Sequence, residues 1–325
     1  MFSKKPSIYT LSFNSSVDYT FYLPRIGLGD INRIDKTRAD AGGKGLNVAR
    51  MLTVLGCNAE ALTFLGGSNG GILKNFLSAE GVKYRHVNTA GNTRSIFNFI
   101  SGAKTLRFNE KGPVISKKEK KEILALIDSL NFKKGGILSI SGSLPPGIEK
   151  DIYRRIIEKA RRKGAAVALD ADGDTLKEGI KGIPHIIKPN LWELERIAGC
   201  RINSSGRLVK ILKKLSAGGI SLILLTLGEK GAVLFSGSEF LYASSSPVKI
   251  RSTIGCGDAF LSGFLCGFSR NQPCEDCLRL AAACGAAKAI KEGTSMPSLG
   301  EVRKLLRKVR ILKVSARTPL PLSHE

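Results

Sequence analysis

The residues best suited to chemistry in this chain form the stretch Thr253-Ile254-Gly255-Cys256-Gly257-Asp258-Ala259-Phe260. Apolar residues continue from it at helical spacing (Phe260, Leu261, Phe264, Leu265 and Phe268), which predicts that the stretch begins a buried helix. Free N–H groups and the dipole at a helix start attract anions, and Gly255 and Gly257 let a phosphate approach the backbone. Asp258 is placed there to accept a proton from an attacking hydroxyl. On this stretch alone, a simple helix cap is the more common role for such an aspartate.

A second glycine-rich turn leads into another predicted helix, with the sequence Asp40-Ala41-Gly42-Gly43-Lys44-Gly45-Leu46-Asn47-Val48-Ala49-Arg50. It matches neither the phosphate-binding P-loop nor the G-x-G-x-x-G dinucleotide turn. Gly42 and Gly43 would let the backbone approach a polyhydroxyl ligand, and the Asn47 amide can both donate to and accept from hydroxyls. Tight packing of a helix on a strand accounts for the glycines equally well.

Two further groups of polar residues have both a ligand-binding and a structural interpretation. Asn190 and Glu193 place two oxygen-bearing side chains near a predicted helix start, a set that suits Mg²⁺, although alone the pair is more typical of a capping box. Four basic residues in or beside a predicted small sheet could hold a substrate phosphate: Arg33, Lys44, Arg94 and Arg107. Each of these, taken singly, is more typical of a surface residue.

The elements that must position these residues alternate between strand and helix after residue 130. Strands are predicted at 136–140, 165–169, 185–187 and 222–225, and helices at 151–163, 190–199, 205–216, 257–269, 275–291 and 299–308. This alternation predicts an α/β fold with a mostly parallel sheet covered on both faces. Such sheets bind ligands at the carboxyl ends of their strands, which selects the loops at 141–147, 170–173, 188–190, 226–231 and 255–258.

The first third of the chain has a different pattern. A core strand is predicted at 8–13 and a helix at 45–55, but the segments near 18–38 and 93–110 read as strands with no helix between them. The second of these segments is predicted to be a hairpin around Ser101-Gly102-Ala103. We interpret these strands as a small β-sheet lid on a single domain spanning residues 1–315. Residues 316–325, with Pro319 and Pro321, are expected to form a flexible tail.

Composition weighs against several classes of protein. The chain has 325 residues and a formal net charge of +24, but its basic residues are dispersed over predicted helices and no nucleic-acid motif occurs. Binding to nucleic acid is therefore the lowest-ranked interpretation. No apolar run approaches the ~20 residues of a membrane span, and no signal peptide is recognised. The 7 cysteines, an odd number, are expected to be free thiols in a cytoplasmic protein.

The chain resembles the phosphofructokinase B family of sugar kinases in a series of segments that occur in the family's order. They are 42–50, 255–258, Asp18-Tyr19-Thr20, 28–33, Phe64-Leu65-Gly66-Gly67, Thr93-Arg94, 109–113, 141–147 and Lys188-Pro189-Asn190. The resemblance extends from about Ile8 to about Met296. It implies a ribokinase-like three-layer α/β/α fold and phosphorylation of a sugar hydroxyl by ATP with Mg²⁺. The segments are most similar to the 1-phosphofructokinase subgroup, and tagatose-6-phosphate kinase shares most of them.

The resemblance also implies a role for individual residues. Asp258 matches the catalytic base, and Gly255, Cys256 and Gly257 match the anion hole. The substrate-binding set is Asp18, Gly43 and Asn47 for the sugar, Arg94 for its phosphate, with Lys44, Arg107, Arg33 and Ser141 as further contacts. The nucleotide side is Lys188, Asn190, Glu193, Thr226, Gly228 and Gly231, of which Asn190 and Glu193 match an Asn-x-x-Glu element that acts on Mg²⁺ indirectly. A sugar phosphate and ATP are the expected small-molecule partners, with no nucleic acid or membrane, and lid sheets of this kind can meet across a homodimer.

Three segments depart from the family's usual sequence. Asn14-Ser15-Ser16-Val17-Asp18 stands where the family usually has Asn-Pro-Ala-Ile-Asp, Cys256 replaces an alanine, and Asp170-Ala171-Asp172-Gly173 replaces Asp-Thr-Ser-Gly. None of these changes removes a catalytic group. A kinase for tagatose 6-phosphate or fructose 6-phosphate stays open as an alternative, and so does a non-catalytic protein that binds a sugar phosphate.

Overall fold

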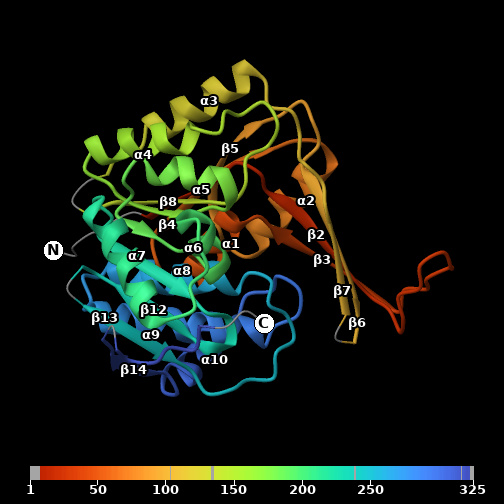
Figure 1. The fold of residues 1–325 in the computed structure, drawn as a ribbon. Coiled ribbons are helices and arrows are strands. Elements are labelled where there is room, and N and C mark those ends of the chain that lie inside the picture. Colours follow the sequence, from red (N-terminus) through yellow and green to blue (C-terminus); the bar gives the residue numbers. More distant parts are fainter. Residues whose placement is uncertain (1–7, 103, 133–134, 238, 316, 323–325) are drawn as a thin grey trace.

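A ten-stranded sheet forms the centre of the structure, a computed structural model that describes residues 8–102, 104–132, 135–237, 239–315 and 317–322 (Figure 1). The strands lie in the order β14 (Arg310–Lys313), β13 (Phe240–Ser244), β12 (Ala232–Phe235), β11 (Leu222–Thr226), β10 (Ile186–Ile187), β9 (Ala166–Asp170), β8 (Ile137–Ser141), β1 (Ile8–Ser12), β4 (Ala59–Leu65) and β5 (Lys83–Asn88). All neighbours from β11 to β5 are parallel, and β12, β13 and β14 extend the β11 edge as antiparallel strands.

Helices cover both faces of this sheet, so the predicted three-layer α/β/α fold is confirmed (Figure 1). One face carries α3 (Lys117–Asp128), α4 (Ile152–Arg162), α5 (Gly173–Ile180), α6 (Leu191–Ala198) and α7 (Ser205–Ala217). The other carries α1 (Lys44–Val54), α8 (Cys256–Phe268), α9 (Cys274–Ala289) and α10 (Leu299–Leu306). Side chains of β1 alternate between the two faces of the sheet. Leu11 packs into the core beneath the first group of helices, and Ile8 packs into the core beneath the second group.

A second sheet of four strands forms the lid, in the order β3 (Lys36–Gly42), β2 (Ser16–Tyr22), β6 (Arg94–Ser101) and β7 (Lys104–Asn109). These strands project from the body of the molecule at one side (Figure 1). Helix α2 (Gly67–Ala79) packs with the base of β2 and β3 in a small separate core that includes Val17, Ala41 and Leu73. The hairpin predicted at 93–110 is present as β6 and β7.

Two expectations about the elements need correction, and one feature of the mostly parallel sheet was not predicted. Residues 23–35 within the expected lid segment form an irregular loop between β2 and β3 instead of strands. The sheet also gains an antiparallel edge that the alternating pattern did not predict. In the expected tail, residues 317–322 lie against the body: Leu320 and Leu322 pack on the larger core cluster, and the Leu320 N–H donates to Ser205 Oγ. Residues 316 and 323–325 of that tail lie outside the described residues.

No helix in the described part of the chain combines the length and the apolar character needed to cross a membrane.

Candidate active site

The N-terminus of α8 has the geometry of an anion-binding turn. Gly255 caps the helix in a left-handed conformation (φ 77°), which a residue with a Cβ rarely adopts. Asp258 lies in the first turn and is buried, with 5% of its surface exposed. The Ser262 hydroxyl bridges the backbone oxygens of Asp258 and Val48, at 2.7 and 3.2 Å, and so fixes α8 against α1. The turn is therefore held rigidly at the carboxyl ends of the parallel strands.

Asn47 connects the two glycine-rich turns predicted from the sequence. Its Nδ2 group donates to Asp258 Oδ2 at 2.9 Å, although the two residues are 211 positions apart. Burial, together with the nearby charge of Asp170, raises the pKa of Asp258 to about 6. A carboxylate with this pKa is ionised at neutral pH and still accepts a proton readily, which suits a general base.

Two lysines converge on Asp170, which is fully buried at the end of β9. Lys44 Nζ lies 3.1 Å from Asp170 Oδ1, and Lys188 Nζ lies 3.2 Å from Asp170 Oδ2. Burial opposes the charge of Asp170, but Lys188 and Lys44 outweigh it and keep the pKa of this carboxyl below its usual value. Lys188 Nζ also lies 3.2 Å from where a Cβ on Gly257 would be, so its ammonium borders the anion-binding turn. Two ammonium groups thus face the single carboxylate of Asp170 in the same cleft as Asp258.

Cys256 replaces the family's usual alanine within the anion-binding turn. Its Sγ lies 3.6 Å from the backbone oxygen of Ser252, to which the thiol donates. Burial raises the pKa of the Cys256 thiol to about 11, so the side chain is neutral at physiological pH. The thiol therefore places no negative charge against an incoming phosphate.

The lid contributes a second buried carboxyl group, Asp18 on β2. Burial raises the pKa of Asp18 to about 6, and the Ser16 hydroxyl opposes that shift by donating to Asp18 Oδ1 at 2.6 Å. Gly42 on the neighbouring strand leaves the space that this carboxyl occupies, because a Cβ there would lie 1.9 Å from Asp18 Oδ1. The departure at Ser16 therefore supplies a hydrogen bond that an alanine lacks.

Polar and basic side chains line the face of the lid that points to the cleft. Arg94 Nε donates to the Asn14 backbone oxygen at 3.1 Å, and Arg107 Nε donates to Asn98 Oδ1 at 3.1 Å. Asn14 Nδ2 donates to Ser143 Oγ at 3.3 Å, while its buried Oδ1 has no hydrogen-bond partner in the described part of the protein. A buried acceptor without a partner at the wall of a cleft is well suited to a ligand hydroxyl.

The opposite wall of the cleft is built around the start of α6 and the end of β11. Asn190 and Glu193 form a reciprocal capping box, in which each side chain accepts from the other's backbone N–H at 2.8 Å. Asn190 also forms an isolated β-bridge with Thr226, next to the 3₁₀ turn η1 (Gly228–Lys230). Burial and the charge of Asp170 raise the pKa of Glu193. The capping box positions the Glu193 carboxyl at the cleft and does not exclude a ligand role.

These elements enclose one cleft of ≈ 1110 Å³. Its lining includes all of the predicted site residues except two: Asp18, Gly43, Lys44, Asn47, Arg94, Arg107, Lys188, Asn190, Glu193, Thr226, Gly228, Gly231, Gly255, Cys256, Gly257 and Asp258. Arg33 is exposed on the loop at 23–35 and does not line the cleft. Ser141 is fully buried at the end of β8, so the following residues, Gly142 and Ser143, line the cleft instead.

Several residues of the cleft were not among the predicted site residues. They are Asn14, Ile96, Asn98, Asn109, Ser143, Asp170 and Asp172, together with residues from the segment 245–250. Period-two alternation could have found Asn98 and Asn109, because they share a strand face with Arg94 and Arg107. Ser143, Asp170 and Asp172 lie in the loops 141–147 and 170–173 that were selected as ligand-binding from their place after predicted strands, although none of the three was named as a site residue.

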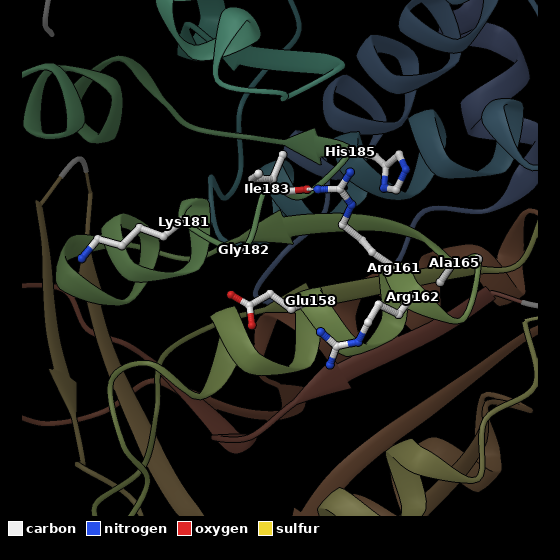
Figure 2. A pocket seen from close by; sticks show the side chains of 9 residues that line it. Glu158, Arg161, Arg162, Ala165, Lys181, Gly182, Ile183 and His185 are labelled. Atoms are coloured by element: carbon white, nitrogen blue, oxygen red, sulfur yellow. Dashed lines mark hydrogen bonds between the residues drawn. The ribbon is translucent and has the colours of Figure 1, made fainter.

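A second hollow, of ≈ 500 Å³, lies at the amino ends of β9 and β10, the edge opposite the cleft. Figure 2 shows the side chains that line it. Arg161 and Arg162 reach it from α4, and Lys181 and His185 complete its basic lining. Arg161 is engaged by the backbone oxygen of Ile183, to which it donates. None of the predicted site residues contributes to this hollow.

Comparison with known proteins identifies the family. Residues 11–299 match the family described as pfkB family carbohydrate kinase. The chain belongs to this family. It is therefore a carbohydrate kinase, a phosphotransferase that acts on a hydroxyl group, and the arrangement of Asp258 beside an anion-binding turn agrees with that chemistry.

Similar proteins cover almost the whole chain. A 1-phosphofructokinase of Bacillus subtilis is 32% identical over 94% of this chain and 100% of its own length. A tagatose-6-phosphate kinase of Staphylococcus epidermidis is 29% identical over 94% of this chain and 100% of its own. Among solved structures, phosphofructokinase-2 of Escherichia coli in complex with substrates and products has a TM-score of 0.88 at 26% identity, covering 93% of this chain and 98% of that one. These likenesses confirm the ribokinase-like fold and the sugar kinase class of this protein.

Proposed function

We propose that this carbohydrate kinase transfers the γ-phosphoryl group of ATP to the C6 hydroxyl of fructose 1-phosphate, forming fructose 1,6-bisphosphate and ADP. The observation that carries the proposal is the Asp258 carboxyl group, buried at the start of α8 and held by Asn47 at 2.9 Å. Lys44 and Lys188 lie on the same cleft, so a base for the hydroxyl and cations for the phosphates converge there.

The proposed step is an in-line displacement at the γ-phosphorus. The C6 oxygen forms a bond to phosphorus, its proton passes to Asp258, and the bond from phosphorus to the bridging oxygen of ADP breaks. Charge developing on the phosphoryl oxygens is stabilised by the backbone N–H groups of Gly255 and Gly257 and by Lys188 beside them, while the Cys256 N–H donates within the turn to the Thr253 backbone oxygen at 3.3 Å. The polar face of the lid covers the sugar and limits hydrolysis of ATP by water.

The cleft residues fit a magnesium ion that arrives with the nucleotide. Among the described residues, no group of three or more His, Cys, Asp or Glu side chains could hold a metal by itself. Glu193, whose pKa is raised by burial and by Asp170, would gain from a nearby cation and would act on the ion with Asn190. When bound, Mg²⁺ neutralises phosphate charge and orients the phosphates of ATP. A ribokinase of Arabidopsis thaliana with the same fold is described as complexed with ribose and ATP.

The choice of sugar follows the names of the relatives and the phosphate contacts on the lid. Relatives named 1-phosphofructokinase occur in Bacillus subtilis and Borreliella burgdorferi, at 32% and 30% identity. Arg94 and Arg107 extend from the lid into the cleft, where bidentate guanidinium groups suit the C1 phosphate. Tagatose 6-phosphate is the second candidate, because tagatose-6-phosphate kinases of two Staphylococcus epidermidis strains are 29% and 30% identical over 94% of this chain.

A coupled assay of ADP release, with ATP and Mg²⁺, tests this proposal against fructose 1-phosphate, fructose 6-phosphate and tagatose 6-phosphate. We expect fructose 1-phosphate to have the highest kcat/KM. A preference for another of the three would keep the mechanism and replace the substrate. Absence of turnover on all three, with retained binding of a sugar phosphate, would favour the non-catalytic alternative.

Replacing the proposed base separates its role from nucleotide binding. Asp258→Asn should lower kcat by ~10²–10⁴-fold, because the amide cannot accept the proton, while ATP affinity measured by calorimetry stays near that of the wild type. Retention of more than about a tenth of the activity would rule out Asp258 as the base.

We further propose that two copies of the chain associate through their lids. On the face of the lid opposite the cleft, Phe108 is 56% exposed and Leu106 is 40% exposed, next to the stacked rings of Phe21 and Phe99. Exposed apolar groups gathered on one sheet face favour burial against a partner.

A further inference from the structure

Lys288 is a fully buried lysine that the proposed mechanism does not use. It lies near the end of α9 with 0% of its surface exposed. Its Nζ donates to the Gly293 backbone oxygen at 2.8 Å, and no carboxylate of the described residues lies within ion-pair distance of it. A buried ammonium group without a carboxylate is costly, since its charge loses hydration without an ionic partner. A methionine would fill a similar volume without that cost.

The position of Lys288 connects it to the anion-binding turn. Its Cε atom lies 3.4 Å from where a Cβ on Gly255, the residue that caps α8, would be. Asn47 Nδ2 and Asp258 Oδ2 lie 3.6 and 3.9 Å from the same point, so the end of the lysine side chain packs close to the proposed base, although Lys288 itself does not line the cleft. Two of the lysine's neighbours, Gly285 and Ala289 on α9, line the cleft themselves.

The titratable groups around Lys288 come from three other elements. They are Arg50 on α1, Asp40 on β3, and Asp258 and the Cys256 thiol on α8. Asp40 is already engaged by Arg38, at 2.7 and 2.6 Å, and Arg50 by Glu80, at 2.6 Å. Burial lowers the pKa of Lys288 to about 8, so the free enzyme loses this charge in mildly alkaline solution. The neighbouring groups therefore leave the ammonium only partly compensated.

We propose that Lys288 is a positioning residue whose ammonium group supports the turn at Gly255 to Asp258 and balances the charge of a phosphoryl group bound at that turn. The inference rests on the proposed function of that turn. An anion at the turn compensates the buried charge, and the interaction is strong because Lys288 is shielded from solvent, with 0% of its surface exposed. Because the charge develops further in the transition state, Lys288 acts on kcat more than on ground-state binding. The kinase then carries, within its own chain, a cation that serves the anion hole.

A purely structural role is the alternative to be separated. A lysine in the last turn of a helix interacts favourably with the helix dipole and with free carbonyl groups, as Lys288 does with Gly293. That role predicts a loss of stability when the charge is removed and an unchanged kcat for the folded protein. The proposed role predicts a lower kcat without a loss of stability. Removing an uncompensated buried charge relieves the energetic cost of that charge in the free enzyme.

The test compares Lys288→Met with Lys291→Met, measuring kcat, KM for the sugar phosphate and the thermal midpoint. Lys291 lies three residues on and makes a surface ion pair with Glu301 at 3.0 Å, so its variant is the matched control. We expect Lys288→Met to lower kcat about 10- to 100-fold with a KM within about threefold of the wild type, and to melt no earlier. A kcat within about twofold of the wild type would overturn the inference.

A second variant keeps the test decisive if the methionine disturbs packing. In Lys288→Ala the cavity can admit a small cation, so ammonium or methylammonium chloride should restore activity at least about fivefold, and sodium chloride at equal ionic strength should not. The wild type and Lys291→Met should not respond. Failure of rescue in a folded Lys288→Ala variant contradicts the electrostatic role. A failure of the proposed function would be recognised separately. The turnover of the wild type and the loss of turnover in Asp258→Asn are both measured independently of Lys288.

Discussion

At the scale of residues, the orientation of the proposed base depends on a chain of hydrogen bonds in which the residue types fix which group donates and which accepts. An arginine side chain only donates, so Arg50 Nη1, at 3.1 Å, requires an oxygen on Asn47. The Asn47 amide is thereby fixed with its NH₂ group toward Asp258. Arg50 is itself held by Glu80 and by the backbone oxygen of Ala41. The carboxylate is therefore positioned through Arg50 and Glu80, neither of which lines the cleft.

The pKa of Asp258 leads to a prediction of the pH dependence. Burial raises the pKa to about 6, and a base must be unprotonated, so activity is present above that pH and is lost as the pH falls through it. We expect kcat/KM to fall about tenfold per pH unit below pH 6, measured between pH 4.5 and 8. Asn47→Ala removes a hydrogen bond that lowers this pKa, so its acid limb should move to higher pH. A profile that is flat from pH 5 to 7 would contradict the assignment.

Much of the site could be predicted from the sequence because its key groups lie in short local motifs. Two glycine-rich segments contain Asp258 and its turn, Gly43 and Asn47, and the chemistry of these segments can be inferred from the sequence alone. Lys288 could not be predicted, since a lysine in a helix is normally exposed and its burial depends on how α9 packs behind α8. The role of Ser16 could not be predicted either, because its hydroxyl group acts by donating to Asp18, and that contact exists only on the folded strand.

At the scale of elements, the sequence predicted periodic segments best. Helix α4 was expected at 151–163 and spans Ile152–Arg162, with Ile152, Ile156 and Ile157 buried on one face. Residues 23–35 were assigned to strands because their alternation resembles a strand, but no neighbouring strand pairs with them and they form a loop. The antiparallel edge of β12 to β14 was missed, since pairing direction depends on long-range topology and not on local pattern.

Gly42 gives a prediction at this scale, because the packing of β3 against β2 depends on its missing side chain. In Gly42→Ala the new Cβ would lie 1.9 Å from Asp18 Oδ1 and 2.6 Å from Ser16 Oγ. Either strand β3 or the Asp18 carboxyl group must therefore move. We expect a loss of ~1–3 kcal/mol in the free energy of unfolding, measured with urea, and a KM for the sugar phosphate raised at least tenfold.

Gly71→Ala is the matched control for this substitution. Gly71 is exposed on α2, and nothing lies within 4 Å of its potential Cβ. Alanine is the better helix former, so this variant should keep wild-type kinetics and gain up to ~1 kcal/mol in the free energy of unfolding. Equal behaviour of the two variants would mean that Gly42 does not hold Asp18 in place.

At the scale of the whole molecule, the lid has two faces with different chemistry. Alternation along β6 and β7 puts Asn98 and Arg107 on the cleft side, and Phe99 and Phe108 on the other. The net charge of +24 belongs to the chain as a whole, whereas the cleft lining carries six carboxyl groups and five basic side chains. An anionic substrate is thus attracted to the molecule as a whole, and individual cations such as Lys44, Lys188 and Arg107 are what the cleft offers it.

The apolar lid face yields the prediction on assembly. Phe108 is 56% exposed at the edge strand of the lid. A glutamate at this position would lose its hydration if two lids meet, which opposes association, and would stay hydrated if they do not. We expect the wild type to elute as a dimer in size-exclusion chromatography with light scattering, and Phe108→Glu to shift it to a monomer at equal concentration. Leu312→Glu, at a similarly exposed apolar position on β14 of the main sheet, should leave the dimer intact. A dimer that survives Phe108→Glu, or a monomeric wild type, would show that the aromatic face serves another purpose.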